Sequence, residues 1–175
     1  MSKKVTIAAL YHFTNQPIKD LLNLQEKLLL TGKSEGIQGT LLIAQEGING
    51  TIAGPSEGIN AIIKTIEESL EIEKLSWKQS AYEANPFYRF KVKIKKEIVT
   101  LGKNSKNVSS KTGKHIEPKD WNQVISDPDT IVIDTRNDYE TSIGTFKNAT
   151  DPKTKNFREF PDYVKETLLD AKNKK

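Results

Sequence analysis

The order of apolar segments in the first hundred residues restricts the fold of this chain more than any other feature of its sequence. Residues 5–13 are apolar, β-branched and aromatic, a composition typical of a buried strand. Residues 14–17 (Thr-Asn-Gln-Pro) supply turn and helix-start chemistry, and apolar residues then recur near every 3.6 positions. The sequence therefore predicts a strand followed by an amphipathic helix over residues 17–31, with Gly32 near its end.

The segments that follow continue this alternation. Residues 36–44 and 48–53 have the pattern of two strands, and the short stretch 45–47 (Gln-Glu-Gly) between them predicts a hairpin. A second amphipathic helix is expected over residues 55–70, and a further strand around residues 75–79. The resulting order, β-α-β-β-α-β, is the split βαβ arrangement of an α+β, ferredoxin-like fold, which acylphosphatases share.

A fifth strand is expected within residues 87–101, where apolar and cationic side chains alternate. Three apolar residues are interleaved with three lysines: Phe90, Val92 and Ile94 with Lys91, Lys93 and Lys95. Because successive side chains of a strand point to opposite faces, one face of this strand would meet the core while the other is cationic. We expect this strand at an edge of the sheet.

Composition then divides the chain into two parts. Residues 102–114 contain few apolar side chains and many Lys, Ser, Asn and Gly residues, which is typical of a linker. We therefore expect a first domain over residues 1–101, a linker over 102–117 and a second domain over 118–175.

The second domain has the pattern of part of an α/β fold. It opens with a short helix over residues 118–125, and residues 130–134 then have the composition of a fully buried strand in a parallel sheet. A polar loop over 134–140 follows at the carboxyl end of that strand, where open α/β sheets place their ligands. With only one more helix, over 157–172, the sheet cannot close, so we expect this domain to be incomplete.

The absence of cysteine excludes disulfides, thiolate metal sites and a cysteine nucleophile within these 175 residues. No run of about 18 apolar residues could cross a bilayer, and no apolar stretch of signal-peptide length follows the basic start, so a cytoplasmic protein without a membrane partner is expected. His12 and His115 are too isolated to form a metal site, and no metal is expected.

Positive charge is concentrated in one stretch of a chain whose net charge is +4. Between residues 91 and 114 there are eight lysines and one acidic residue, Glu97. The functional interpretation is a surface that binds RNA phosphates, with an affinity that falls as salt rises. The alternative is an edge strand that its lysines protect from aggregation, followed by a solvated linker.

Two further groups of residues are candidates for contacts with RNA. Tyr88 and Arg89 have the chemistry to stack on unpaired bases, whereas Phe87 beside them fits better beneath a sheet. Asn49 lies in the segment 46–50 (Glu-Gly-Ile-Asn-Gly), which either exposes a polar loop to substrate or forms the turn of the predicted hairpin.

The motifs of the second domain resemble those of a known enzyme class. Residues 134–140 (Asp-Thr-Arg-Asn-Asp-Tyr-Glu) and 144–149 (Gly-Thr-Phe-Lys-Asn-Ala) resemble the opening of a rhodanese domain, although Thr145 and Asn148 stand where histidine and glycine are common. With these departures the chain resembles the bacterial rhodanese-like tRNA uridine hydroxylase family over essentially all of its residues. The matching segments are 45–51, 114–122, 143–149 and 156–161.

This resemblance implies an activity that the chain alone cannot perform. The family oxygenates the wobble uridine of certain tRNAs to 5-hydroxyuridine, with molecular oxygen as co-substrate and an essential cysteine in the loop after the next rhodanese strand. That strand would begin beyond Lys175, so we expect an amino-terminal fragment that recognises the anticodon region of tRNA and is catalytically silent. The chain itself shows no cofactor, and its oligomeric state stays open.

The resemblance and the residues together give the candidate site. The substrate-binding candidates are Tyr88, Arg89, Lys91, Lys93, Lys95, Lys103, Lys111, Lys114 and Asn49. Asp134 and Arg136 are expected to support the rhodanese loop as an ion pair rather than to take part in chemistry. Two alternatives are a non-catalytic ferredoxin-like module that binds RNA or protein, and an acylphosphatase, whose phosphate-binding arginine has no counterpart in residues 13–17.

Overall fold

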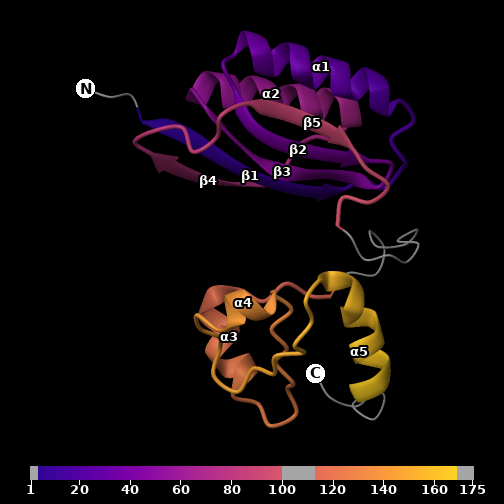
Figure 1. The fold of residues 1–175 in the computed structure, drawn as a ribbon, viewed down its shortest axis with the longest axis vertical. Helices are drawn as coiled ribbons and strands as arrows, with labels where there is room; N and C mark the ends of the chain where they lie inside the picture. The colour runs from indigo at the N-terminus through magenta and orange to yellow at the C-terminus, as the bar shows by residue number, and fades with distance from the viewer. Residues whose placement is uncertain (1–3, 100–112, 169–175) are drawn as a thin grey trace. The chain divides into compact units, whose positions relative to one another are not determined.

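The computed structural model describes residues 4–99 and 113–168, and these fall into two compact units (Figure 1). The first unit lies within residues 4–99 and the second within residues 113–168. Most of the predicted linker, residues 102–112, lies outside the described residues.

The first unit is a five-stranded sheet with two helices on one of its faces (Figure 1). The strands, in the order β4-β1-β3-β2-β5, are β1 (Val5–Phe13), β2 (Gln38–Ala44), β3 (Gly47–Gly54), β4 (Trp77–Tyr82) and β5 (Phe90–Ile94). Neighbouring strands are antiparallel except β2 and β5, which run parallel. The helices are α1 (Leu21–Ser34) and α2 (Ser56–Leu70). The predicted ferredoxin-like fold and the edge position of the fifth strand are confirmed.

The hydrophobic core fills the space between the sheet and its two helices. Every second residue of the central strands points into it, and α2 contributes four isoleucines along one side because they recur at helical spacing. The fully buried side chains include Leu28, Leu41, Ile43, Ile48, Ile52, Ile59, Ile62 and Ile66.

Helix α1 differs from its prediction at both ends. It begins at Leu21 because the Asp20 side chain caps it by accepting a hydrogen bond from the Asn23 N–H (2.9 Å), whereas Pro17 belongs to the preceding loop. Gly32 lies near the end of the helix as predicted, but it is a buried residue of the last turn, and the helix continues to Ser34. A Cβ atom on Gly32 would overlap the Phe90 ring of β5, so glycine is needed here for close packing.

The other elements of this unit follow the predicted pattern with shifted ends. β2 and β3 form the predicted hairpin around the turn residues Gln45 and Glu46. Strand β4 begins only at Trp77, because Leu75 turns into the core and donates its N–H to the Glu67 carboxylate (2.9 Å). Within residues 87–99, β5 covers only Phe90–Ile94, and residues 100–101 of the predicted strand lie outside the described residues.

The second unit contains short helices: α3 (Pro118–Ile125), α4 (Asp138–Thr141), the 3-10 turn η2 (Phe157–Glu159) and α5 (Phe160–Thr167). α3 has the predicted bounds. α4 was predicted as loop, and it forms because Asn137 and Glu140 make a reciprocal capping box. The predicted final helix starts with the 3-10 turn and ends at Thr167, and residues 169–172 of that prediction lie outside the described residues.

The prediction of a fully buried strand over residues 130–134 is wrong. Only a single parallel bridge, between Ile133 and Thr150, forms there, and the apolar side chains of 131–133 stay partly exposed. A parallel strand becomes buried only when helices or strands cover both of its faces, and the described part of this unit supplies too few. Within the described ranges, no helix has the length and apolar character needed to cross a membrane.

Candidate nucleic-acid interface

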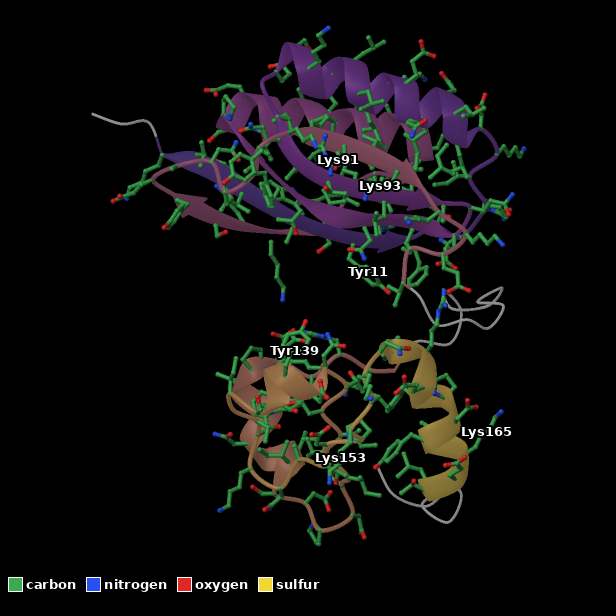
Figure 2. All side chains as sticks on the ribbon, viewed as in Figure 1. Tyr11, Lys91, Lys93, Tyr139, Lys153 and Lys165 are labelled. Atoms are coloured by element: carbon green, nitrogen blue, oxygen red, sulfur yellow. The ribbon has the colours of Figure 1, made fainter. Side chains whose placement is uncertain are left out.

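The face of the sheet opposite α1 and α2 carries two cross-strand rows of side chains, and we call it the open face. These side chains alternate along each strand with those of the core, and Tyr11 extends on the side away from the helices (Figure 2). The register places one row as Lys78, Ala9, Thr51, Thr40 and Lys91. The neighbouring row is Tyr11, Asn49, Leu42 and Lys93.

A lysine therefore stands at both ends of the first row and at one end of the second. Lys78 lies on the β4 edge. Lys91 and Lys93 lie along β5 at the opposite edge (Figure 2). None of the three forms an ion pair within residues 4–99. Many acidic residues of this unit lie instead on α2 or directly after it: Glu57, Glu67, Glu68, Glu71 and Glu73. The open face is thus the more cationic side of the sheet.

Two chain segments border the open face at its ends. At one end the segment between β4 and β5 crosses the sheet, where the Asn85 side chain donates to the Ala53 carbonyl (3.3 Å). At the other end Ile98, which is 2% exposed, donates its N–H to the Glu46 carboxylate (2.7 Å) and accepts from the Asn49 side chain (3.0 Å). The rows lie in the space between these two borders.

A hollow of about 350 Å³ opens on this face beside Tyr11. Its lining includes Ala9, Tyr11, Asn49, Thr51 and Lys78. Tyr11 is 50% exposed, and its ring makes an edge-on contact with the Phe13 ring, whose centroid lies 5.2 Å away. Partial burial and the negative charge of Glu46 raise the pKa of Tyr11, so its hydroxyl stays neutral at physiological pH.

The structure brings together three of the candidates that the sequence predicted: Asn49, Lys91 and Lys93. Asn49 does not lie in an exposed loop, as one interpretation held, because it belongs to β3. Its side chain donates an N–H to the Ile98 carbonyl. The predicted hairpin is confirmed, but its turn is Gln45 and Glu46, and residues 47–50 belong to β3.

The other candidates lie apart from the two rows or outside the described residues. Tyr88 is 99% exposed and Arg89 is exposed, while their carbonyls accept hydrogen bonds from the Gln38 side chain and the Gly39 N–H at the start of β2. Lys95 is exposed just after β5, and its N–H extends the strand pairing to the Ile43 carbonyl (2.8 Å). Lys114 is exposed in the second unit, and Lys103 and Lys111 lie outside the described residues.

Sequence reasoning missed Tyr11, Thr51 and Lys78. Residues 5–13 were interpreted as one buried strand, whereas the structure exposes Ala9 and Tyr11 and buries Ala8 and Leu10. The alternation of buried and exposed positions along this strand could have indicated its exposed face. That alternation is hard to see in the sequence because Ala9 and Tyr11, which are exposed, are themselves nonpolar or aromatic.

Asp134 and Arg136 form a closed network in the second unit. The Asp134 carboxylate accepts from the Arg136 Nε (2.9 Å) and Nη2 (2.6 Å) and from the Thr145 hydroxyl (2.8 Å), and Arg136 also donates to the Gly144 carbonyl (2.6 Å). Hydrogen bonds from Arg136, and then from Thr145, hold the pKa of Asp134 well below its usual range. The network ties residues 134–136 to residues 144–145, which keeps both side chains engaged with the loop itself.

Two further features bear on chemistry. A second hollow, of about 500 Å³, lies where the loop before α1 meets the end of α2, and Gln16, Lys19 and Lys27 are among its lining residues. Among the described residues, no three His, Asp or Glu side chains gather into a group that could hold a metal ion.

Several solved structures are similar to about half of this chain at low sequence identity. The full-length HypF protein in its phosphate- and nucleotide-bound form matches with 13% identity and a TM-score of 0.35, over 51% of this chain and 11% of that one. Acylphosphatases from Coxiella burnetii (9% identity, TM-score 0.35) and Bacillus subtilis (10%, 0.33) match over 51% of this chain and 92% and 96% of theirs. This chain thus spans about a tenth of HypF but nearly all of each acylphosphatase.

A family assignment comes from the sequence of the same unit. Residues 5–98, which include all five strands and both helices, match the model of the UPF0176 acylphosphatase-like domain. Because this match covers more than half of the 175 residues, the chain belongs to the UPF0176 acylphosphatase-like domain family.

Proposed function

We propose that this chain is the substrate-recognition part of a tRNA-modifying enzyme that hydroxylates the wobble uridine, and that its open face binds the anticodon region of tRNA. The observation that carries the proposal is the pair of rows across the sheet: Lys78 and Lys91 flank the hydroxyl groups of one row, and Lys93 stands opposite Tyr11 in the other, with Asn49 between them. The lysines at the edges of the sheet would attract phosphates of the RNA backbone. The aromatic, amide and hydroxyl groups on the central strands can contact bases.

The edge-protection alternative accounts for only part of this arrangement. Lysines on β4 and β5 would indeed discourage strands of other chains from pairing with either edge. That role needs charge at the edges alone, and it gives no reason for an exposed Tyr11 or for the hollow beside it. A nucleic-acid surface accounts for the edges and the centre together.

The hydroxylation in this proposal rests on the resemblance of the second unit to the rhodanese-like tRNA hydroxylases. In support, none of the buried apolar residues of the described chain comes from residues 113–168, and Trp121 Nε1 and Thr130 Oγ1 are buried with no hydrogen-bond partner there. Such a unit has the properties of part of a larger rhodanese-type domain, in which Asp134 and Arg136 would hold the loop. Molecular oxygen would be the co-substrate and the cytoplasm the compartment.

The chain supplies recognition rather than chemistry in this scheme, because it has no cysteine to act as the essential thiol. Alone it should not hydroxylate uridine. The alternative is a non-catalytic module that binds RNA or protein. Such a module would also bind RNA, but it would make no contribution to uridine hydroxylation.

Binding of an anticodon stem–loop RNA with uridine at the wobble position tests the proposal. The intact chain is titrated into the labelled RNA, and fluorescence anisotropy gives the affinity at several salt concentrations. The double variant Lys91→Ala/Lys93→Ala should bind about tenfold more weakly at low salt, and the slope of log affinity against log salt should fall by roughly 1.5, because two phosphate contacts are lost.

The matched control removes two lysines from the helical side of the unit. Lys33→Ala/Lys64→Ala changes the net charge by the same amount, but these residues lie on α1 and α2, so binding should stay within about twofold of the unaltered chain. Equal losses in the two double variants, or no RNA binding by the unaltered chain at low salt, would contradict the proposed function.

A further inference from the structure

The open face has a place for a single base as well as for phosphates, and this step rests on the proposed function. We propose that the hollow beside Tyr11 receives one unpaired nucleobase of the RNA, which stacks on the Tyr11 ring while the strand crosses the sheet between Lys78 and Lys91.

The ring of Tyr11 is suited to stacking because it is both accessible and fixed. The residue is half exposed, and the edge-on contact of its ring with Phe13, at 82° between the rings, holds the ring from one side. A held ring loses little conformational entropy when a base stacks on it, which favours binding. Aromatic side chains on an open sheet bind unpaired bases in this manner in several classes of RNA-binding protein.

The lining of the hollow offers polar groups for the edge of a base. Asn49 uses one amide N–H for Ile98, and an amide carries a second N–H and a carbonyl oxygen besides. Thr51 lies in the adjacent row, with Lys78 at the end of that row. The rest of the lining of this hollow is Ala9, Leu10, Tyr11, Gly50, Ser76 and Trp77.

Charge determines which row the RNA backbone would follow. Lys78 and Lys91 stand at the two ends of one row, whereas the neighbouring row has a lysine, Lys93, at one end only. Phosphates are therefore attracted most strongly to the row between Lys78 and Lys91. That row spans five strands, roughly 19 Å at the usual strand spacing, which is enough for a few nucleotides.

The experiment compares a single-stranded loop with a duplex. The intact chain is titrated into the anticodon stem–loop RNA and into a blunt RNA duplex of equal length, which offers phosphates but no unpaired base. Tyr11→Ala should weaken stem–loop binding about tenfold or more and leave duplex binding unchanged, whereas Tyr11→Phe, which keeps the ring, should bind the stem–loop within about threefold of the unaltered chain.

A lysine pair provides the second readout. Lys78→Ala should weaken stem–loop binding about threefold or more, whereas Lys74→Ala should have no effect, because Lys74 precedes β4 and lies outside the two rows. Far-UV circular dichroism and thermal melting of each variant show whether it is folded. If Tyr11→Ala is unfolded, Tyr11→Leu replaces it in the comparison of stem–loop with duplex, since leucine also removes the aromatic ring. The Lys78→Ala and Lys74→Ala variants are then compared in the same way.

The outcomes separate this inference from the proposed function. If Tyr11→Ala weakens stem–loop and duplex binding equally, or neither, the base site is wrong even though the Lys91 and Lys93 effects still support RNA binding. If Tyr11→Ala instead changes the molecular mass in light scattering, the face is a contact between copies of the chain and the inference fails. If no RNA binds at all, both proposals fail together.

Discussion

At the scale of single residues, Asp134 shows how far the hydrogen-bonding partners of a carboxylate determine its charge state. It accepts hydrogen bonds from the Arg136 guanidinium and from the Thr145 hydroxyl, both of which favour the ionised form. Because its pKa is lowered by folding, Asp134 stabilises the folded second unit at every pH above its ordinary value of about 4. That stabilisation is lost as the pH falls from there through the lowered pKa.

This pH dependence is directly measurable. The carbon-13 resonance of the Asp134 carboxyl in the intact chain should show no titration between pH 7 and pH 4. In Arg136→Gln the midpoint should rise toward about 4, since the strongest donors are removed, and in Thr145→Val it should rise by less. A midpoint near 4 in the unaltered chain would show that the network does not form in solution.

Single residues also mark the limit of sequence reasoning about the site. Lys91 and Lys93 were identified because their charge alternates visibly with apolar neighbours. Tyr11 and Thr51 were not, because a tyrosine in an apolar strand has the same pattern whether it faces a core or an uncovered surface. Which face the helices cover is a property of the folded chain, and only the structure separates the two.

At the scale of elements, the pairing of β2 with β3 depends on Gly39, which stands where no side chain fits. Gly39 has φ +122°, and a Cβ there would overlap the Thr51 carbonyl and lie 2.7 Å from the Ile52 Cα. Gly36, just before the strand, has φ +66° with nothing within 4 Å of an added Cβ. A side chain at Gly36 would therefore introduce backbone strain alone, whereas a side chain at Gly39 would introduce backbone strain together with a clash between β2 and β3.

We expect Gly36→Ala to destabilise the chain by about 1 kcal/mol, because the left-handed conformation disfavours a Cβ. Gly39→Ala should destabilise it by roughly 3 kcal/mol, since β2 and β3 must also move apart. Urea unfolding followed by circular dichroism gives both values. Equal effects of the two substitutions would mean that β2 and β3 are not as close as the structure places them.

The elements that sequence reasoning located well are those that local chemistry determines. The β2–β3 hairpin and α2 were found because a short turn and the periodicity of the isoleucines specify them without distant contacts. The end of α1 was misplaced because Gly32 is selected by the Phe90 ring, nearly sixty residues away. The prediction of a strand over residues 130–134 was wrong because it also depended on distant contacts: a parallel strand needs neighbouring elements that the local sequence does not specify.

At the scale of the whole molecule, the two units differ sharply in how much apolar surface they bury. The core cluster lies entirely between Ala8 and Val92, whereas the described residues of the second unit contribute no buried apolar side chain. Burial of apolar surface is the main source of stability, so the first unit should be stable by itself and the second only weakly so.

A fragment of residues 1–99 should therefore unfold cooperatively, with a thermal midpoint within a few degrees of that of the intact chain. In the intact chain, hydrogen exchange should be slow in β1, β3 and α2 and much faster throughout α3 and α5. A fragment without a cooperative transition would show that the first unit depends on the rest of the chain. Comparable protection in both units would contradict the difference in burial.

The positions of β4 and β5 also have a consequence for how the chain assembles. These strands follow one another in sequence but occupy opposite edges of the sheet, so β5 cannot join by simple hairpin zipping. A nascent chain that has not yet emerged as far as Phe90 presents the outer edge of β2 with its backbone groups unpaired, a template for strands of other chains. The period between synthesis of β2 and docking of β5 is thus when this protein is most exposed to aggregation, and chaperones that shield strand edges would act then.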